Sequence, residues 1–195
     1  MKKIIQIIIF LFSITSHAQN WMPTGIPLSV KQLRVIYTDS INNKLYVAGA
    51  ITLDGTGNYY KNAICMYDGN TWTVLDTIND LIKSVVVFQN ELIVGGIFPG
   101  VNGQAMPYLV KWDGTNWQQF GGNINSSVTK LRVINNELYV IGNFTQIGGI
   151  TANYVAKWDG SSWSDFNNLQ ALGVYINAIA YFNNEWYVAG NFTMF

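Results

Sequence analysis

Histidine and cysteine are almost missing from this chain of 195 residues, which holds one of each, His17 and Cys65. A single cysteine excludes an intramolecular disulfide bond and cannot supply the ligands of a structural zinc site. Nucleophilic constellations of the Ser-His-Asp and Cys-His kinds need a histidine, and His17 lies in a segment that we expect to be removed. We therefore predict a protein that is not an enzyme and has no metal or cofactor. A pair of carboxylates that hydrolyses glycosides is the catalytic alternative left open.

Charged residues are also scarce, at 11% of the chain, and the eleven basic residues balance the eleven acidic ones. This balance implies no basic patch for nucleic acid or anionic lipid. Hydrophobic residues make up 49% and aromatic residues 14% of the chain, which is enough for the packed core of one globular domain. The abundance of glycine, asparagine and threonine favours a β-rich protein with many tight turns.

Residues 1–18 have the form of a secretory signal peptide. Lys2 and Lys3 give the positive start, residues 4–14 form a short apolar run, and Ser16-His17-Ala18 places small residues before the cleavage point. The run of about eleven residues is short for a membrane span, although an N-terminal anchor is the alternative. We expect a mature chain that is secreted to the extracellular space or the cell surface, without membrane insertion.

A pair of motifs recurs at intervals of about 46 residues, which indicates a repeat architecture. The first motif reads Asn-Asn-Glu-Leu-Tyr-Val-Ile-Gly at 135–142, with close variants at 42–49, 89–96 and 183–190. The second motif, Asp-Gly-x-x-Trp, stands at 68–72, 113–117 and 159–163. The same structural unit is therefore expected several times along the chain.

Each unit has the signals of four short antiparallel strands. In the third unit we expect strands at 128–134 and 137–144, joined by Asn135-Asn136, because asparagine tolerates the positive φ of a two-residue turn. Two further strands are expected at 154–158 and 163–166. The turn between them begins at Asp159, which bonds to nearby backbone, and Gly160 supplies a conformation that a Cβ would oppose. The last unit predicts strands at 176–182 and 185–193.

Four strands in such a period predict an all-β fold, a β-propeller of four-stranded blades that is incomplete and open, with about 3.5 blades. The predicted segments are a stray outer strand at 19–27, blades at 28–76, 77–121 and 122–167, and a partial blade at 168–195. The stray strand is expected because residues 19–23 resemble 115–119, the outer strand of a blade. We expect a fragment of a longer protein; the alternative is an open arc whose exposed blade edges pair with another chain.

Residues that recur in every unit are interpreted as structural, which for the tryptophans means packing between blades rather than stacking on sugars. These positions are Gly49, Gly96, Gly142, Gly190, Asp68, Gly69, Trp72, Asp113, Gly114, Trp117, Asp159, Gly160 and Trp163. Recurrence of Glu91, Glu137 and Glu185 at the starts of hairpin strands favours the same interpretation for the carboxylates.

The stretches 142–149 (Gly-Asn-Phe-Thr-Gln-Ile-Gly-Gly) and 155–163 (Val-Ala-Lys-Trp-Asp-Gly-Ser-Ser-Trp) carry a family likeness. They resemble the kelch and galactose-oxidase-like propeller repeats, and more closely the repeats of large secreted bacterial proteins and of the Rax2-like fungal cortical polarity marker. The resemblance implies the repeat type over most of the mature chain, and it implies no particular activity. The copper site of galactose oxidase cannot be built without a mature histidine.

The function expected from these observations is that of a secreted, non-catalytic scaffold for extracellular binding or adhesion, with an unknown extracellular protein or glycan as partner. The alternative is a part of a larger extracellular, polysaccharide-active enzyme whose catalytic module lies outside this chain. Binding residues cannot be assigned one by one, but variable loops of a repeat scaffold are the usual place for them. The candidate loops are Thr52 to Asn62, Phe98 to Met106 and Thr145 to Asn153.

Overall fold

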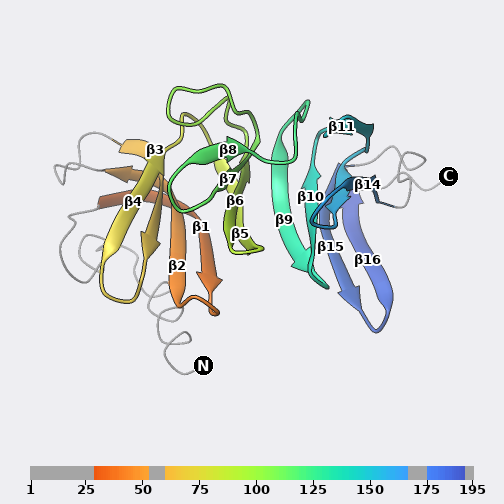
Figure 1. Cartoon of the computed structure of the whole chain (residues 1–195), viewed down its shortest axis with the longest axis horizontal. Coiled ribbons are helices and arrows are strands. Elements are labelled where there is room, and N and C mark those ends of the chain that lie inside the picture. Colours follow the sequence, from red (N-terminus) through yellow and green to blue (C-terminus); the bar gives the residue numbers. More distant parts are fainter. Residues whose placement is uncertain (1–28, 53–59, 167–174, 192–195) are drawn as a thin grey trace.

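The computed structural model describes residues 29–52, 60–166 and 175–191. Over these ranges the chain is built from β-strands joined by turns and loops, without a helix, and the strands form antiparallel sheets (Figure 1). The prediction of an all-β fold is therefore confirmed. The predicted signal peptide and the predicted stray strand at 19–27 lie outside the described residues.

Three sheets have four strands each, and their strands follow one another in space as they do along the chain. The first sheet contains β1 (Ser29–Asp39), β2 (Lys44–Thr52), β3 (Tyr60–Tyr67) and β4 (Trp72–Thr77). The second contains β5 (Ile82–Phe88), β6 (Glu91–Gly96), β7 (Leu109–Trp112) and β8 (Trp117–Gln119). The third contains β9 (Val128–Ile134), β10 (Glu137–Gly142), β13 (Val155–Trp158) and β14 (Trp163–Asp165).

Two smaller sheets have two strands each. A short ribbon of β11 (Gln146–Ile147) and β12 (Ile150–Thr151) lies in the loop between β10 and β13. The hairpin of β15 (Tyr175–Phe182) and β16 (Glu185–Asn191) forms the last sheet at the C-terminal end of the described chain (Figure 1). Both pairs are antiparallel, as in the larger sheets.

The turns predicted in the third unit are confirmed. Asn135 and Asn136 have φ of 50° and 62°, which places both residues in the left-handed region that a type I′ turn requires. The carboxylate of Asp159 accepts hydrogen bonds from the backbone N–H groups of Ser161 and Ser162, at 2.8 and 2.9 Å. Gly160 has a φ of 109°, where a Cβ would be strained.

Some predicted strand ends differ from the observed ones. The strand expected to reach Phe144 ends at Gly142, because the next residue, Asn143, donates its N–H to Ser127 and the chain turns out of the ladder. The strand expected from Tyr154 begins at Val155, since Tyr154 has a φ of 67° that no extended strand contains. Predicted strand 163–166 ends at Asp165, predicted strand 176–182 begins at Tyr175, and predicted strand 185–193 is described as far as Asn191.

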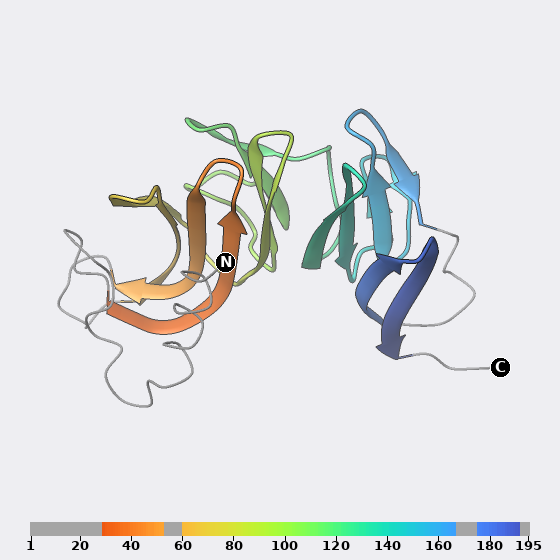
Figure 2. The same ribbon diagram turned by 90° about the horizontal axis from the view of Figure 1, so that it is seen from below.

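The sheets pack face to face, and an apolar layer fills the space between each consecutive pair (Figure 2). Side chains alternate between the two faces of a strand, so Leu92 and Val94 of β6 pack toward the first sheet while Ile93 packs toward the third. The first strands of consecutive sheets are also in contact, β1 with β5, β5 with β9 and β9 with β15. The apolar triplet that recurs in the second strand of each four-stranded sheet, such as Leu92-Ile93-Val94, therefore supplies side chains that pack one sheet against the next.

Candidate functional site

The recurring glycines and tryptophans lie at sites of close packing. Gly49, Gly96, Gly142 and Gly190 end the first motif, and a Cβ built on each would clash with a backbone carbonyl oxygen in, or just before, the first strand of the same sheet. Gly69, Gly114 and Gly160 have φ values of 100°, 102° and 109° in the Asp-Gly turns. Of the tryptophans, Trp117 is buried between the first and second sheets and Trp163 between the second and third, whereas Trp72 is buried with side chains of its own sheet.

The recurring carboxylates are engaged within their own units. Asp68, Asp113 and Asp159 each accept two backbone hydrogen bonds from the turn that they begin, and these bonds lower the pKa of all three. Glu91 and Glu137 pair with Lys111 and Lys157, at 2.8 and 2.9 Å. Within the described ranges no group of three histidine, cysteine or acidic side chains could hold a metal ion.

Two of the three candidate loops are anchored by buried apolar side chains, and the third falls largely on residues 53–59, outside the described part. In the loop from Phe98 to Met106, both Phe98 and Val101 are fully buried, and Val101 and Gln104 exchange backbone hydrogen bonds of 3.0 and 3.1 Å. In the loop from Thr145 to Asn153, Ile147 and Ala152 are fully buried. Anchors of this kind fix each loop against its sheet and leave only its tip exposed to solvent.

The loop from Phe98 to Met106 forms one wall of a cavity of about 230 Å³ between the first and second sheets. The other walls come from β4 and from the turn between β7 and β8. The lining residues are Leu75, Asp76, Asn102, Gln104, Met106, Trp112, Thr115, Asn116 and Trp117. Met106 and Trp117 are buried whereas the side chains of Asn102, Gln104, Thr115 and Asn116 are exposed, so the apolar residues form the inner end and the polar ones the mouth.

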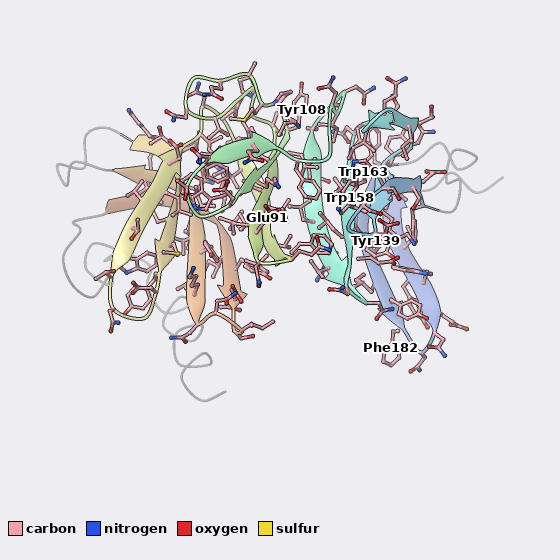
Figure 3. All side chains as sticks on the ribbon, viewed as in Figure 1. Glu91, Tyr108, Tyr139, Trp158, Trp163 and Phe182 are labelled. Atoms are coloured by element: carbon pink, nitrogen blue, oxygen red, sulfur yellow. The ribbon has the colours of Figure 1, made fainter. Side chains whose placement is uncertain are left out.

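The corresponding place between the second and third sheets is closed. There the indole Nε1 of Trp163 donates a hydrogen bond of 2.7 Å to the carbonyl oxygen of Gly121. A Cβ added to Gly148 would lie 2.1 Å from Cδ1 of Trp163, and one added to Gly121 would lie 2.5 Å from Nε1. The two glycines therefore allow the indole to pack directly against backbone. Figure 3 shows Trp163 beside Trp158 in this unit, with ring centroids 5.0 Å apart.

The segments at the interface that contains the cavity differ from those at the closed one. Asn102 follows Gly96 by six residues, as Gly148 follows Gly142, and the two have similar backbone conformations, with φ of 51° and 56°. Asp76 stands four residues after Trp72, as Gly121 does after Trp117, but it lies within β4 and pairs with Ile64 beside a bulge, whereas β8 ends at Gln119. The interface with the cavity therefore carries the polar side chains of Asp76, from the first sheet, and Asn102, from the second.

The indole of Trp117 lacks the hydrogen bond that Trp163 makes, and among the described residues the buried Nε1 of Trp72 lacks an acceptor as well. The Nε1 atom of Trp117 is buried, and the structure gives it no acceptor. A buried N–H without a partner costs about 1–3 kcal/mol. The cavity is thus accompanied by a local loss of stability that the neighbouring interface avoids.

The sequence predicted the loop that walls the cavity but missed Asp76, Trp112 and Asn116. Asp76 lies within β4, outside both recurring motifs, so the repeats themselves do not distinguish it as a cavity residue. Pairing of that position with the loop of the next unit is a tertiary contact, and the period alone does not reveal it.

Over the described residues, the fold is that of an all-β protein of repeated four-stranded antiparallel sheets, with a polar cavity at the boundary of the first two. In the part of the chain that the structure covers, no helix has the length and apolar character needed to cross a membrane. No protein-family model matches the chain, and no curated protein matches its sequence.

Proposed function

We propose that each four-stranded sheet is one blade of a kelch-like β-propeller, with about 3.5 blades in this chain. The proposal is supported by the strand order within each sheet, by the apolar layers between sheets and by the contacts among their first strands. Strands that contact one another from sheet to sheet are the ones that surround the axis of a propeller. The arc of sheets in Figure 2 agrees with blades that radiate from one axis.

The function that we propose is non-catalytic binding or adhesion outside the cell, by a scaffold that reaches that compartment through the signal peptide at 1–18. The carboxylates that recur in the units support a non-catalytic role, because Asp68, Asp113 and Asp159 are held in turns of their own units and Glu91 and Glu137 in ion pairs. Glu185 accepts a hydrogen bond from Tyr187 of its own strand. The binding role rests on the polar cavity that is bordered by the loop from Phe98 to Met106. Ligand pockets usually combine apolar walls with a few convergent polar groups.

A second surface supports a macromolecular partner. Tyr187 of β16 is 50% exposed, whereas Tyr139, at the same position of the preceding unit, is 3% exposed and packs against the last sheet. Tyr175 and Phe182 of the same hairpin are 60% and 63% exposed (Figure 3). The three rings lie along one hairpin, with Tyr175 and Phe182 at its opposite ends, and exposed apolar surface of this kind marks interaction surfaces. The partner that we propose is an extracellular protein or glycan, which could also pair with the edge of this hairpin.

The test is a binding screen combined with a turnover assay on the mature chain from Gln19. The immobilised protein would be presented to a glycan array and to intact bacterial cells, and the same glycans would be incubated with it and analysed for new reducing ends. We expect saturable retention without new reducing ends. Turnover by the isolated chain would overturn the non-catalytic role, and retention of neither glycans nor cells would overturn the binding role.

Secretion is tested separately by fusing residues 1–18 to a reporter enzyme that is active only after export. We expect export of the reporter, and loss of export when Lys2 and Lys3 are replaced by glutamate, because the positive start orients the signal. A reporter that stays inside the cell with the native segment would contradict the extracellular location.

A further inference from the structure

We infer that the cavity between the first and second sheets binds a single uncharged sugar residue. The inference rests on the proposed binding function and names the ligand class and the residues that receive it. Asp76 and Asn102 line the cavity at this boundary, whereas at the next boundary Gly121 and Gly148 let the indole of Trp163 pack directly against backbone.

The size of the cavity selects one ring rather than a chain. Its volume of about 230 Å³ lies below the roughly 300–1,000 Å³ of pockets for drug-sized ligands. One pyranose ring can enter such a space, with any further residues of a glycan left outside the mouth. The exposed Thr115 and Asn116 lie where the rest of a longer glycan would leave the cavity.

The polar lining favours a neutral ligand rich in hydroxyl groups. Asn102, Gln104 and Asn116 bring amide groups that both donate and accept hydrogen bonds, and the Asp76 carboxylate accepts them. Hydroxyl groups do both as well, so adjacent hydroxyls of a sugar can use donors and acceptors that lie side by side. No lysine or arginine is among the lining residues, and Asp76 is the only charged one, so an anionic ligand would be repelled.

The aromatic lining supplies the apolar side of the same recognition. Trp112 and Trp117 lie with ring centroids 5.2 Å apart, and Trp112 is only half-buried. The half-buried indole can pack against the C–H face of a pyranose, as aromatic rings do with flat apolar surfaces. The adaptable thioether of Met106 lies at the inner end, and its rotation can adjust the depth of the cavity.

A ligand in the cavity can also accept a hydrogen bond from the buried Nε1–H group of Trp117. In the third unit the acceptor for the equivalent N–H is the carbonyl oxygen of Gly121, and Trp117 has none. A hydroxyl group that enters between Asp76 and Trp117 accepts from this N–H and donates to the carboxylate. Because Nε1 is buried in the unliganded chain, a ligand reaches this atom only after a side chain that lines the cavity has moved.

The experiment is titration of the mature chain with methyl glycosides of glucose, galactose, mannose and N-acetylglucosamine, followed by saturation-transfer NMR and calorimetry. The test variant is the double substitution Asp76→Gly with Asn102→Gly, which removes two of the polar side chains that line the cavity. We expect saturable binding of at least one glycoside by the native chain and at least a tenfold weaker binding by the double variant. Ser164→Ala, an exposed change on β14 away from the cavity and from the candidate loops, is the matched control and should bind like the native chain.

Several outcomes separate the inference from the proposed function. Failure of all four glycosides to bind the native chain, or equal binding by the double variant, overturns the inference. If glycan-array or cell retention then persists unchanged in the double variant, the binding function stands at another surface. Saturable binding of tetramethylammonium in place of the sugars would assign the cavity to cations and also overturn the inference. A preference for methyl glycosides over reducing sugars identifies the end of a glycan, rather than a free sugar, as the source.

The double variant must be shown to fold. Circular dichroism and the midpoint of urea unfolding serve for this: a native-like spectrum and a cooperative transition show that it folds, with a somewhat lower midpoint because Asp76→Gly places a glycine within β4. Asp76→Asn is a second variant that keeps the shape of the side chain and removes its charge. We expect it to weaken binding severalfold without moving the midpoint, and unchanged binding would exclude the carboxylate from the site.

Discussion

Substitution of phenylalanine for Trp163 or Trp117 separates the hydrogen bond of the indole from its packing. Both tryptophans begin the outer strand of a sheet and are buried between sheets. Trp163 donates to Gly121 at 2.7 Å, and Trp117 has no acceptor. The apolar area lost is similar in the two variants, so their difference in stability reports mainly on this bond. Loss of a hydrogen bond that leaves its partner unsatisfied costs about 1–3 kcal/mol. Because this bond is only partly buried, we expect Trp163→Phe to cost about 1–2 kcal/mol more than Trp117→Phe.

The assay is equilibrium unfolding in urea, with the fluorescence of the remaining tryptophans and circular dichroism as independent probes. Both variants should have the slope of the native chain, since a change of slope indicates an altered unfolded state rather than a lost bond. For a domain of this size the expected difference corresponds to a shift in Tm of roughly 2–8 °C. Equal costs, or a larger cost for Trp117→Phe, would refute the distinction between the closed and the open interface.

Three further predictions concern the reactivity of the buried thiol, the loss of folding stability at acid pH and the packing of the interface between the second and third sheets. Burial raises the pKa of the Cys65 thiol to about 12, so at pH 8 the native chain should react with an alkylating reagent far more slowly than the urea-unfolded chain; equal rates would show that the site is open. A hydrogen bond from Lys157 lowers the pKa of Glu137; its contribution to stability is present above the unfolded value of about 4.3 and is lost as the pH falls through the lower folded value. Glu137→Gln should therefore flatten the loss of stability between neutral and acid pH, and an unchanged pH profile would contradict the pairing. Gly148→Asn should displace the Trp163 indole and cost about 1–3 kcal/mol, measured by urea unfolding with Thr151→Ala as control; a native-like midpoint would show that the interface has room for the side chain.

The repeat made much of the fold predictable. The pair Asn135-Asn136 and the Asp-Gly turn at Asp159 are determined by neighbours in sequence, through positive φ and bonds from a side chain to nearby backbone. Strand ends were less predictable, because Tyr154 looks like a strand residue and takes a φ of 67° only in the context of the loop before it. Its N–H bonds to the carbonyl of Phe144, ten residues away. Contacts of that range leave no local signal in the chain.

The candidate site was only partly predictable for a related reason. The loop that ends at Met106 stood out because its sequence varies between units, which is where scaffolds carry binding residues. Asp76 belongs to the preceding sheet, and its role depends on which face of β4 meets the next sheet. That placement follows from the packing of whole sheets, and a search for motifs along the chain does not reveal it.

Repetition itself indicates where a specific function can lie in this molecule. Positions such as Gly142, Trp163 and Asp159 serve the same packing and turn geometry in each unit, so changing them weakens the fold without distinguishing one unit from another. Asp76 and Asn102 are different, because they line a cavity at the boundary where the N–H of Trp117 has no acceptor, whereas the N–H of Trp163 bonds to Gly121. Local features that cost stability are expected at functional sites rather than in the scaffold. An occupant that supplies the missing acceptor would recover part of that cost on binding, which is why this cavity, and not the recurring tryptophans, is the place to look for the ligand.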